Sequence, residues 1–130
     1  MRRPHPPRLR GDRGYSVLEA AITLPAIVLL TMLVVQWAII WHARHVAQAA
    51  AQEALRAASD YGSTAAAGRQ DGLSMLQLTA PHALQHPRVT VTRGASAVTV
   101  HVHATVYSVI PFATAHIDAT AAGPVEGWTP

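Results

Sequence analysis

The 130-residue chain has no cysteine, ten arginines, no lysine and 25 alanines, and half of its residues are hydrophobic although only 5% are aromatic. This length allows one short anchor and one modest domain, and it argues against a two-domain enzyme. The absence of cysteine excludes a disulfide scaffold, thiolate metal sites and cysteine nucleophiles. The mean hydropathy of +0.19 is high for a soluble domain and indicates that part of the chain lies in lipid.

The basic residues are concentrated at the N-terminus. Residues 1–13 contain five arginines and one aspartate, a charge of +4, so residues 14–130 sum to −1 within the net +3. Pro4, Pro6 and Pro7 disfavour a helix in this arm. A basic arm of this kind sets the orientation of a membrane helix, whereas nucleic-acid binding needs a basic face on a folded domain. We therefore predict no nucleic-acid partner.

An uncharged, mostly apolar run of 22 residues extends from Ala20 to Trp41. A helix of that length measures about 33 Å, enough to cross a hydrocarbon core of about 30 Å. Trp37 and Trp41 lie one turn apart near its C-terminal end, where indole rings favour the headgroup layer. The sequence predicts a single-pass helix in the lipid bilayer of the plasma (inner) membrane, with the N-terminus cytoplasmic and the C-terminus extracytoplasmic.

A secretory signal peptide is the competing interpretation of this segment, because Ala47-Gln48-Ala49 has the small-x-small pattern of a cleavage site. The apolar run is longer than the about 7–15 residues usual for a signal peptide. The candidate site also lies in a stretch that favours helix. The transmembrane interpretation is therefore preferred.

The helix is predicted to continue beyond the membrane, because residues 42–60 contain neither Gly nor Pro and are rich in alanine. Gly62 is the expected stop. Small residues spaced four apart form flat rows along a helix. Such rows permit close helix packing, although a biased composition alone would also produce them. Two rows of alanines spaced four apart run along this helix: Ala43, Ala47 and Ala51, and Ala50, Ala54 and Ala58.

The remaining chain is predicted to be α+β. Glycines predict a loop over residues 62–72, followed by a short second helix over 73–80 that ends at Pro81. Pro87 delimits the next element, and alternating hydrophobicity predicts strands over 88–93, 97–107 and 115–121.

The fold class is therefore a long N-terminal transmembrane helix continuing into an extracytoplasmic helix, then a small antiparallel sheet. The chain divides into a basic, Pro-rich cytoplasmic leader (1–14), the helix (15–61) and a small α+β extracytoplasmic domain (62–130). So small a domain needs cover for its sheet, from helix 42–60 or from partner subunits.

The most informative motif is Arg13-Gly14-Tyr15-Ser16-Val17-Leu18-Glu19, which directly precedes the apolar run. A carboxylate at depth in a membrane costs about 2–3 kcal/mol, so Glu19 either stays in the headgroup layer near Arg13 or has a function. A basic leader ending in Gly, then an aromatic residue, a Glu five residues after the Gly and an apolar helix resemble the processing junction of type IV pilin-like proteins.

More specifically, the chain resembles the TadE family of minor pilins or pseudopilins of the tight-adherence (Flp) pilus system. The resemblance rests on Arg13-Gly14, Val17-Leu18-Glu19-Ala20, Leu24-Pro25 and the alanine-rich helix that follows. It implies a non-enzymatic assembly subunit, cut by prepilin peptidase between Gly14 and Tyr15, in which Glu19 neutralises the amine of a neighbouring subunit. The implied partners are other pilin or pseudopilin subunits and the pilus assembly platform. Pro25 lacks an N–H, so the helix is expected to kink or loosen there.

No catalytic site, cofactor or metal is predicted. His101 and His103 share the polar face of one strand, and other histidines could in principle complete a zinc site, but no acidic or cysteine ligand accompanies them. A solvated strand face is the preferred interpretation. The alternative function is a membrane-tethered extracytoplasmic binding module, unrelated to pili, that uses this His/Thr face. The other histidines considered are His42, His45, His82, His86 and His116.

Overall fold

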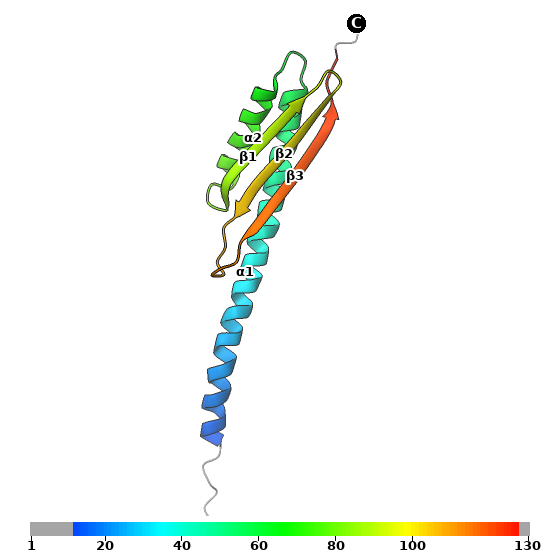
Figure 1. Ribbon diagram of the computed structural model, residues 1–130. Coiled ribbons are helices and arrows are strands. Elements are labelled where there is room, and N and C mark those ends of the chain that lie inside the picture. The colour runs from blue at the N-terminus through cyan, green and yellow to red at the C-terminus, as the bar shows by residue number, and fades with distance from the viewer. Residues whose placement is uncertain (1–11, 128–130) are drawn as a thin grey trace, which may run out of the picture.

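The structure is a computed structural model that describes residues 12–127. The first part of helix α1 projects as a rod from a head, in which the second part of α1 and helix α2 cover one face of a sheet (Figure 1). The predicted α+β class is confirmed. The elements in chain order are α1 (Asp12–Ser59), α2 (Ala65–Thr79), β1 (Leu84–Arg93), β2 (Ala97–Val106) and β3 (Ala115–Pro124).

The sheet is an antiparallel meander in the order β1-β2-β3. Val102 in the central strand pairs with Val89 of β1 and with Ala119 of β3. Successive side chains of a strand point to opposite faces, and the alternation predicted for β2 is confirmed because its apolar residues are all buried. These are Val98, Val100, Val102, Ala104 and Val106.

Strand β1 begins at Leu84, before the predicted start at Arg88. The expectation that Pro87 delimits the strand is wrong, because Pro87 lies inside it, where the register with β2 shifts between Gln85 and Arg88. Proline has no N–H for a ladder bond and is tolerated on an edge strand at a bulge.

Helix α2 occupies most of the segment predicted as a loop over 62–72, so that prediction is wrong from Ala65 onward. Thr64 caps the helix, since its Oγ1 accepts a hydrogen bond from the Ala67 N–H at 3.2 Å. Gly68 and Gly72 are buried inside α2. Glycine lowers helix propensity, so tertiary packing must compensate here.

That packing is a close approach of α2 to α1. A Cβ added at Gly68 would lie 2.6 Å from the Cβ of Ala58, and one added at Gly72 would lie 2.9 Å from the Cβ of Ala54. These distances are shorter than van der Waals contact. Glycine is therefore required where the two helices touch, and here it does not break the helix.

Helix α1 ends at Ser59, and the chain then turns through Gly62, which has a φ of +77° as the predicted stop requires. The last carbonyls of a helix have no partner within it. Here three other segments provide donors. Arg93 Nη1 donates to the carbonyl of Ala58, Ser63 Oγ to that of Ala57, and the Glu126 N–H to that of Ser59.

Candidate functional site

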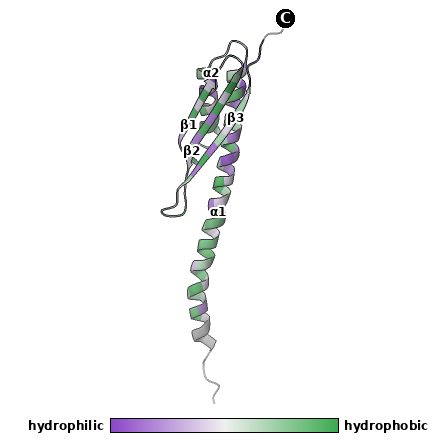
Figure 2. Cartoon of the chain, turned by 45° about the vertical axis from the view of Figure 1, so that its right-hand side comes forward, coloured by the Kyte–Doolittle hydropathy of each residue, from purple (hydrophilic) through white to green (hydrophobic). Residues whose placement is uncertain are grey.

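The candidate functional surface is the part of α1 that stands outside the head, residues 16–42, here called the stem. Its large apolar side chains are exposed around the helix, and most of the stem has the hydrophobic colour in Figure 2. A helix that is apolar all round and unburied belongs in lipid or against other apolar surfaces. The side chains that are 43–69% exposed are Val17, Leu18, Ile22, Leu24, Ile27, Val28, Leu29, Leu30, Leu33, Val34, Val35, Trp37 and Trp41.

The two ends of the stem lie about one bilayer apart. Exposed Glu19 and half-exposed Trp41 are separated by 22 positions, about 33 Å along a helix. The next formally charged residue after Glu19 is Arg44. The Trp41 ring packs edge-on against His45, with centroids 4.3 Å apart. Within the described residues, α1 is the one helix long and apolar enough to cross a membrane.

The motif predicted to be a processing junction, residues 13–19, lies at the start of α1. The backbone of Gly14 and Tyr15 is helical, while residues 1–11 of the predicted leader lie outside the described residues. Helix α1 continues through Pro25 as one element. Farther along, Thr31 Oγ1 donates a hydrogen bond to the Ile27 carbonyl at 2.8 Å, so this hydroxyl is satisfied within the helix.

The alanine rows lie in the head, not on the stem. All six residues are at most 1% exposed and belong to the hydrophobic core that α1 forms with α2 and the sheet. In a single chain these rows are therefore unavailable to neighbouring subunits, and the stem is the apolar surface that remains. Cleavage after Ala49, as a signal peptide would require, would remove Ala43 and Ala47 from this core.

Gln36 holds the connection between β2 and β3, a role that sequence reasoning missed because it noted this residue only as an interruption of the apolar run. Its side chain is buried, and its Oε1 accepts hydrogen bonds from the Val109 N–H at 2.8 Å and from Ser108 Oγ at 3.2 Å. Its Nε2 donates to the Tyr107 carbonyl at 3.4 Å. A lone amide in an otherwise apolar helix is the signal that could have indicated a polar partner.

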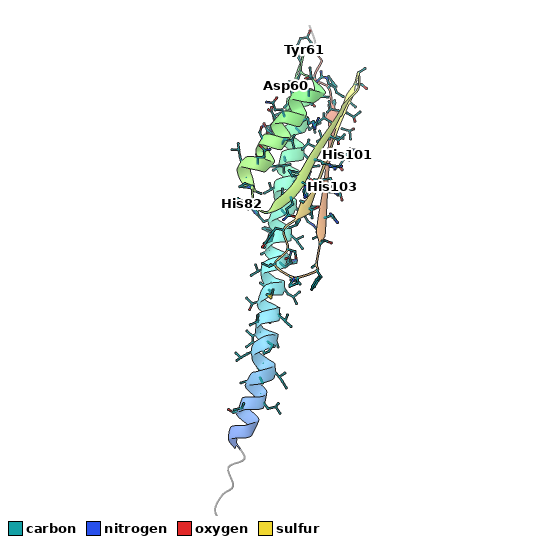
Figure 3. The ribbon with its side chains drawn as sticks, turned by 60° about the vertical axis from the view of Figure 1, so that its left-hand side comes forward. Asp60, Tyr61, His82, His101 and His103 are labelled. Carbon is teal, nitrogen blue, oxygen red and sulfur yellow. The ribbon has the colours of Figure 1, made fainter. Side chains whose placement is uncertain are left out.

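The strand histidines lie on the face of the sheet that is turned away from the helices, where Figure 3 shows His101 and His103. His103 Nδ1 lies 2.7 Å from Asp118 Oδ1 on the neighbouring strand, and both side chains are at least half exposed. Among residues 12–127, no group of three or more His, Cys, Asp or Glu side chains could hold a metal ion. The other two histidines of this face also have cross-strand hydroxyl partners, His101 with Thr120 and His116 with Thr105.

Residues 14–56 match the family model described as TadE-like protein. The N-terminal helix is TadE-like. This match confirms the resemblance drawn from the motif and covers about one third of the chain, including Glu19, the whole stem and most of the buried half of α1. No curated protein and no solved structure matches the chain. The TadE-like family belongs with the Tad (Flp) pilus system, and residues 14–56, which include the candidate membrane anchor, are similar to that family.

Proposed function

We propose that this protein is a non-enzymatic minor pilin or pseudopilin of the Flp/Tad type IV pilus and secretion system. The observation that carries the proposal is the stem. It is TadE-like in sequence, apolar around its whole circumference and one bilayer long. A surface of this kind serves in lipid and then against the apolar helices of neighbouring subunits when a filament assembles.

The proposed topology places the N-terminus in the cytoplasm and the head outside. Five arginines precede the stem, whereas only Arg44 and Arg56 follow it closely. Positive charge is retained on the cytoplasmic side of a membrane helix. In this orientation Gly14 and Tyr15 lie near the cytoplasmic boundary, within reach of a membrane peptidase that would cut between them.

Glu19 is proposed as the assembly residue. Its carboxylate stands at the edge of the apolar stem, and in an assembled bundle it would pair with the α-amino group that cleavage creates at Tyr15 of an adjacent subunit. Pairing would reduce the cost of an ionised carboxylate in a low-dielectric environment. This assigns Glu19 to subunit contact and gives it no catalytic part.

Glu19→Ala tests this role. The variant should enter the membrane normally, because the stem is unchanged, but it should be lost from pilus-associated complexes recovered by crosslinking. Glu53→Ala is the matched control, since Glu53 lies on the same helix, within the head, and only its exposed pair with Arg56 at 3.9 Å is removed. Normal recovery of Glu19→Ala in assembled complexes would overturn the assignment.

A further inference from the structure

The connection between β2 and β3, residues 107–114 and here called the loop, lies at the end of the head from which the stem emerges (Figure 1). Its tip is apolar. Val109 and Ile110 are partly buried, whereas Phe112 is fully exposed at 107%. Phe112 also has a φ of +64°, a conformation rarely adopted by bulky residues. An exposed aromatic ring held in an unfavourable backbone conformation indicates a function outside the head.

Gln36 fixes the level of the loop along the stem. The hydrogen bonds from its amide to Tyr107 and Val109 hold the loop beside the helix at that residue. Gln36 lies five residues before Trp41. The loop therefore lies about 7.5 Å from Trp41 along the helix axis, toward the N-terminal end of the stem. With Trp41 in the headgroup layer, the loop reaches the depth of about 5–10 Å at which interfacial apolar groups are buried.

The same end of the head lacks formal charges. Strand β2, the loop and the first three residues of β3 lie within residues 94–117, which contain no Asp, Glu, Lys or Arg, and neither do residues 72–87 at the end of α2 and the start of β1. The charged residues of the sheet nearest the loop are Arg88 and Asp118. Both are register partners of His103, which lies about 13 Å from the loop along β2.

Apart from Tyr107 within the loop, the titratable groups named near it are histidines. His82 is exposed in the α2–β1 connection at the same end of the head (Figure 3), and His116 is exposed two residues beyond the loop. His42 and His45 lie on α1 near Trp41. Histidine presents an apolar body and a polar tip, so these side chains are compatible with the headgroup layer.

Four of the seven backbone N–H groups of the loop have hydrogen-bond partners, as apolar surroundings favour. The N–H groups of Tyr107, Val109, Ile110 and Ala113 donate to the Ala83 carbonyl, Gln36 Oε1, Ser108 Oγ and the Ile110 carbonyl, respectively. Pro111 has no N–H. The N–H groups of Ser108, Phe112 and Thr114 in this described loop are left to water and headgroups, which suits an interfacial depth and excludes the bilayer centre.

We infer that the β2–β3 loop is a second membrane anchor, whose tip from Val109 to Phe112 inserts into the leaflet on the side of the head. The inference rests on the proposed membrane insertion of the stem. A helix and a loop that enter the same leaflet fix both the tilt of the head and its rotation about the stem. The head of a membrane-resident subunit would then present one defined side to its neighbours.

Cysteine labelling tests the loop directly, because the chain has no native cysteine. Single thiols are introduced by Ala113→Cys in the loop, Leu29→Cys in the stem and Ala95→Cys in the exposed β1–β2 turn. Each full-length variant is placed at one copy per nanodisc of phosphatidylcholine and phosphatidylglycerol and reacted with a membrane-impermeant maleimide. The loop thiol should react on the order of tenfold more slowly than the turn thiol.

A second substitution sharpens the test. Phe112→Asp, added to Ala113→Cys, should raise the labelling rate to that of Ala95→Cys, while the unfolding midpoint of the head stays unchanged because the ring contacts solvent alone in the isolated head. Equal rates for Ala113→Cys and Ala95→Cys, with Leu29→Cys protected, would overturn the loop anchor and leave the stem in the membrane. Rapid labelling of Leu29→Cys would overturn the proposed function itself.

A protein neighbour at the loop is distinguished by the same probe. If the thiol at position 113 labels rapidly in single-copy nanodiscs but is protected in cells that assemble the pilus, a sister subunit covers the loop and the lipid assignment is wrong. Protection in both settings supports the lipid assignment, since no neighbour is present in the nanodisc.

Discussion

The two halves of α1 share one secondary structure and have opposite surroundings. From Ser16 to Val35 the helix is exposed apart from one half-buried methionine, whereas Ala43 to Ser59 forms the centre of the head core. The first half carries large aliphatic side chains and the second carries alanines. Side-chain size therefore decides what each half can contact, because lipid accommodates bulky chains and a second helix at close range does not.

This comparison separates two kinds of stability in one molecule. The stem depends on its solvent, since none of the described residues covers the exposed side chains of residues 16–35. The head depends on close contacts among small residues, where additional volume is as damaging as missing volume. Substitutions in the stem should therefore change the free energy of membrane insertion, and substitutions in the head should change its free energy of unfolding.

The largest effect is expected from Leu76→Ala in the head. Leu76 is 1% exposed and is among the largest fully buried side chains. Its truncation should lower the unfolding free energy of the head by about 2–5 kcal/mol. Leu78→Ala is the matched control on the same helix, because Leu78 is 83% exposed. Chemical unfolding in detergent measures both, and similar losses for the two variants would contradict the assigned core.

An intermediate effect is expected from Leu29→Arg in the stem. The substitution should raise the free energy of membrane insertion by about 2.5–3.5 kcal/mol, because the guanidinium lies near the centre of the apolar run. The unfolding free energy of the head should change by less than about 0.5 kcal/mol. A quantitative insertion assay, with Leu29→Phe as the control, and unfolding in detergent separate the two quantities. Unimpaired insertion of Leu29→Arg would argue against a span centred there.

A smaller effect is expected from Gly68→Ala at the α1–α2 contact. The new methyl group would meet the Ala54 carbonyl oxygen and the Ala58 Cβ at 2.6 Å. Overpacking of this kind costs about 1–3 kcal/mol, more than the gain in helix propensity returns. Gly127→Ala is the control, because an added Cβ there meets nothing within 4 Å. Thermal unfolding should show a lower midpoint for Gly68→Ala alone, and a stabilised variant would refute the close approach.

Strand β2 shows what could be predicted from the sequence. The apolar residues from Val98 to Val106 alternate with polar residues. In a sheet with one covered face, this pattern allows only the orientation in which the apolar side chains lie on the covered face. The apolar run from Ala20 to Trp41 was equally predictable, because length and hydropathy are properties of the local sequence. The TadE-like motif at Glu19 was readable for the same reason.

The errors occurred where distant parts of the chain decide the local structure. Gly68 and Gly72 were interpreted as loop residues, although their spacing of four places both on one side of a helix against α1. Pro87 was interpreted as a strand boundary. Its actual position, inside β1 at a register shift, depends on pairing with β2, which the local sequence does not show. Gln36 gave no hint of its partners, which lie more than 70 positions away.

The central claim is that the stem lies in a bilayer, and membrane extraction tests it most directly. Full-length protein expressed in bacterial cells should remain in the membrane pellet after alkaline carbonate washing and enter solution only with detergent. Recovery of the intact chain as a stable monomer in detergent-free buffer would contradict the account.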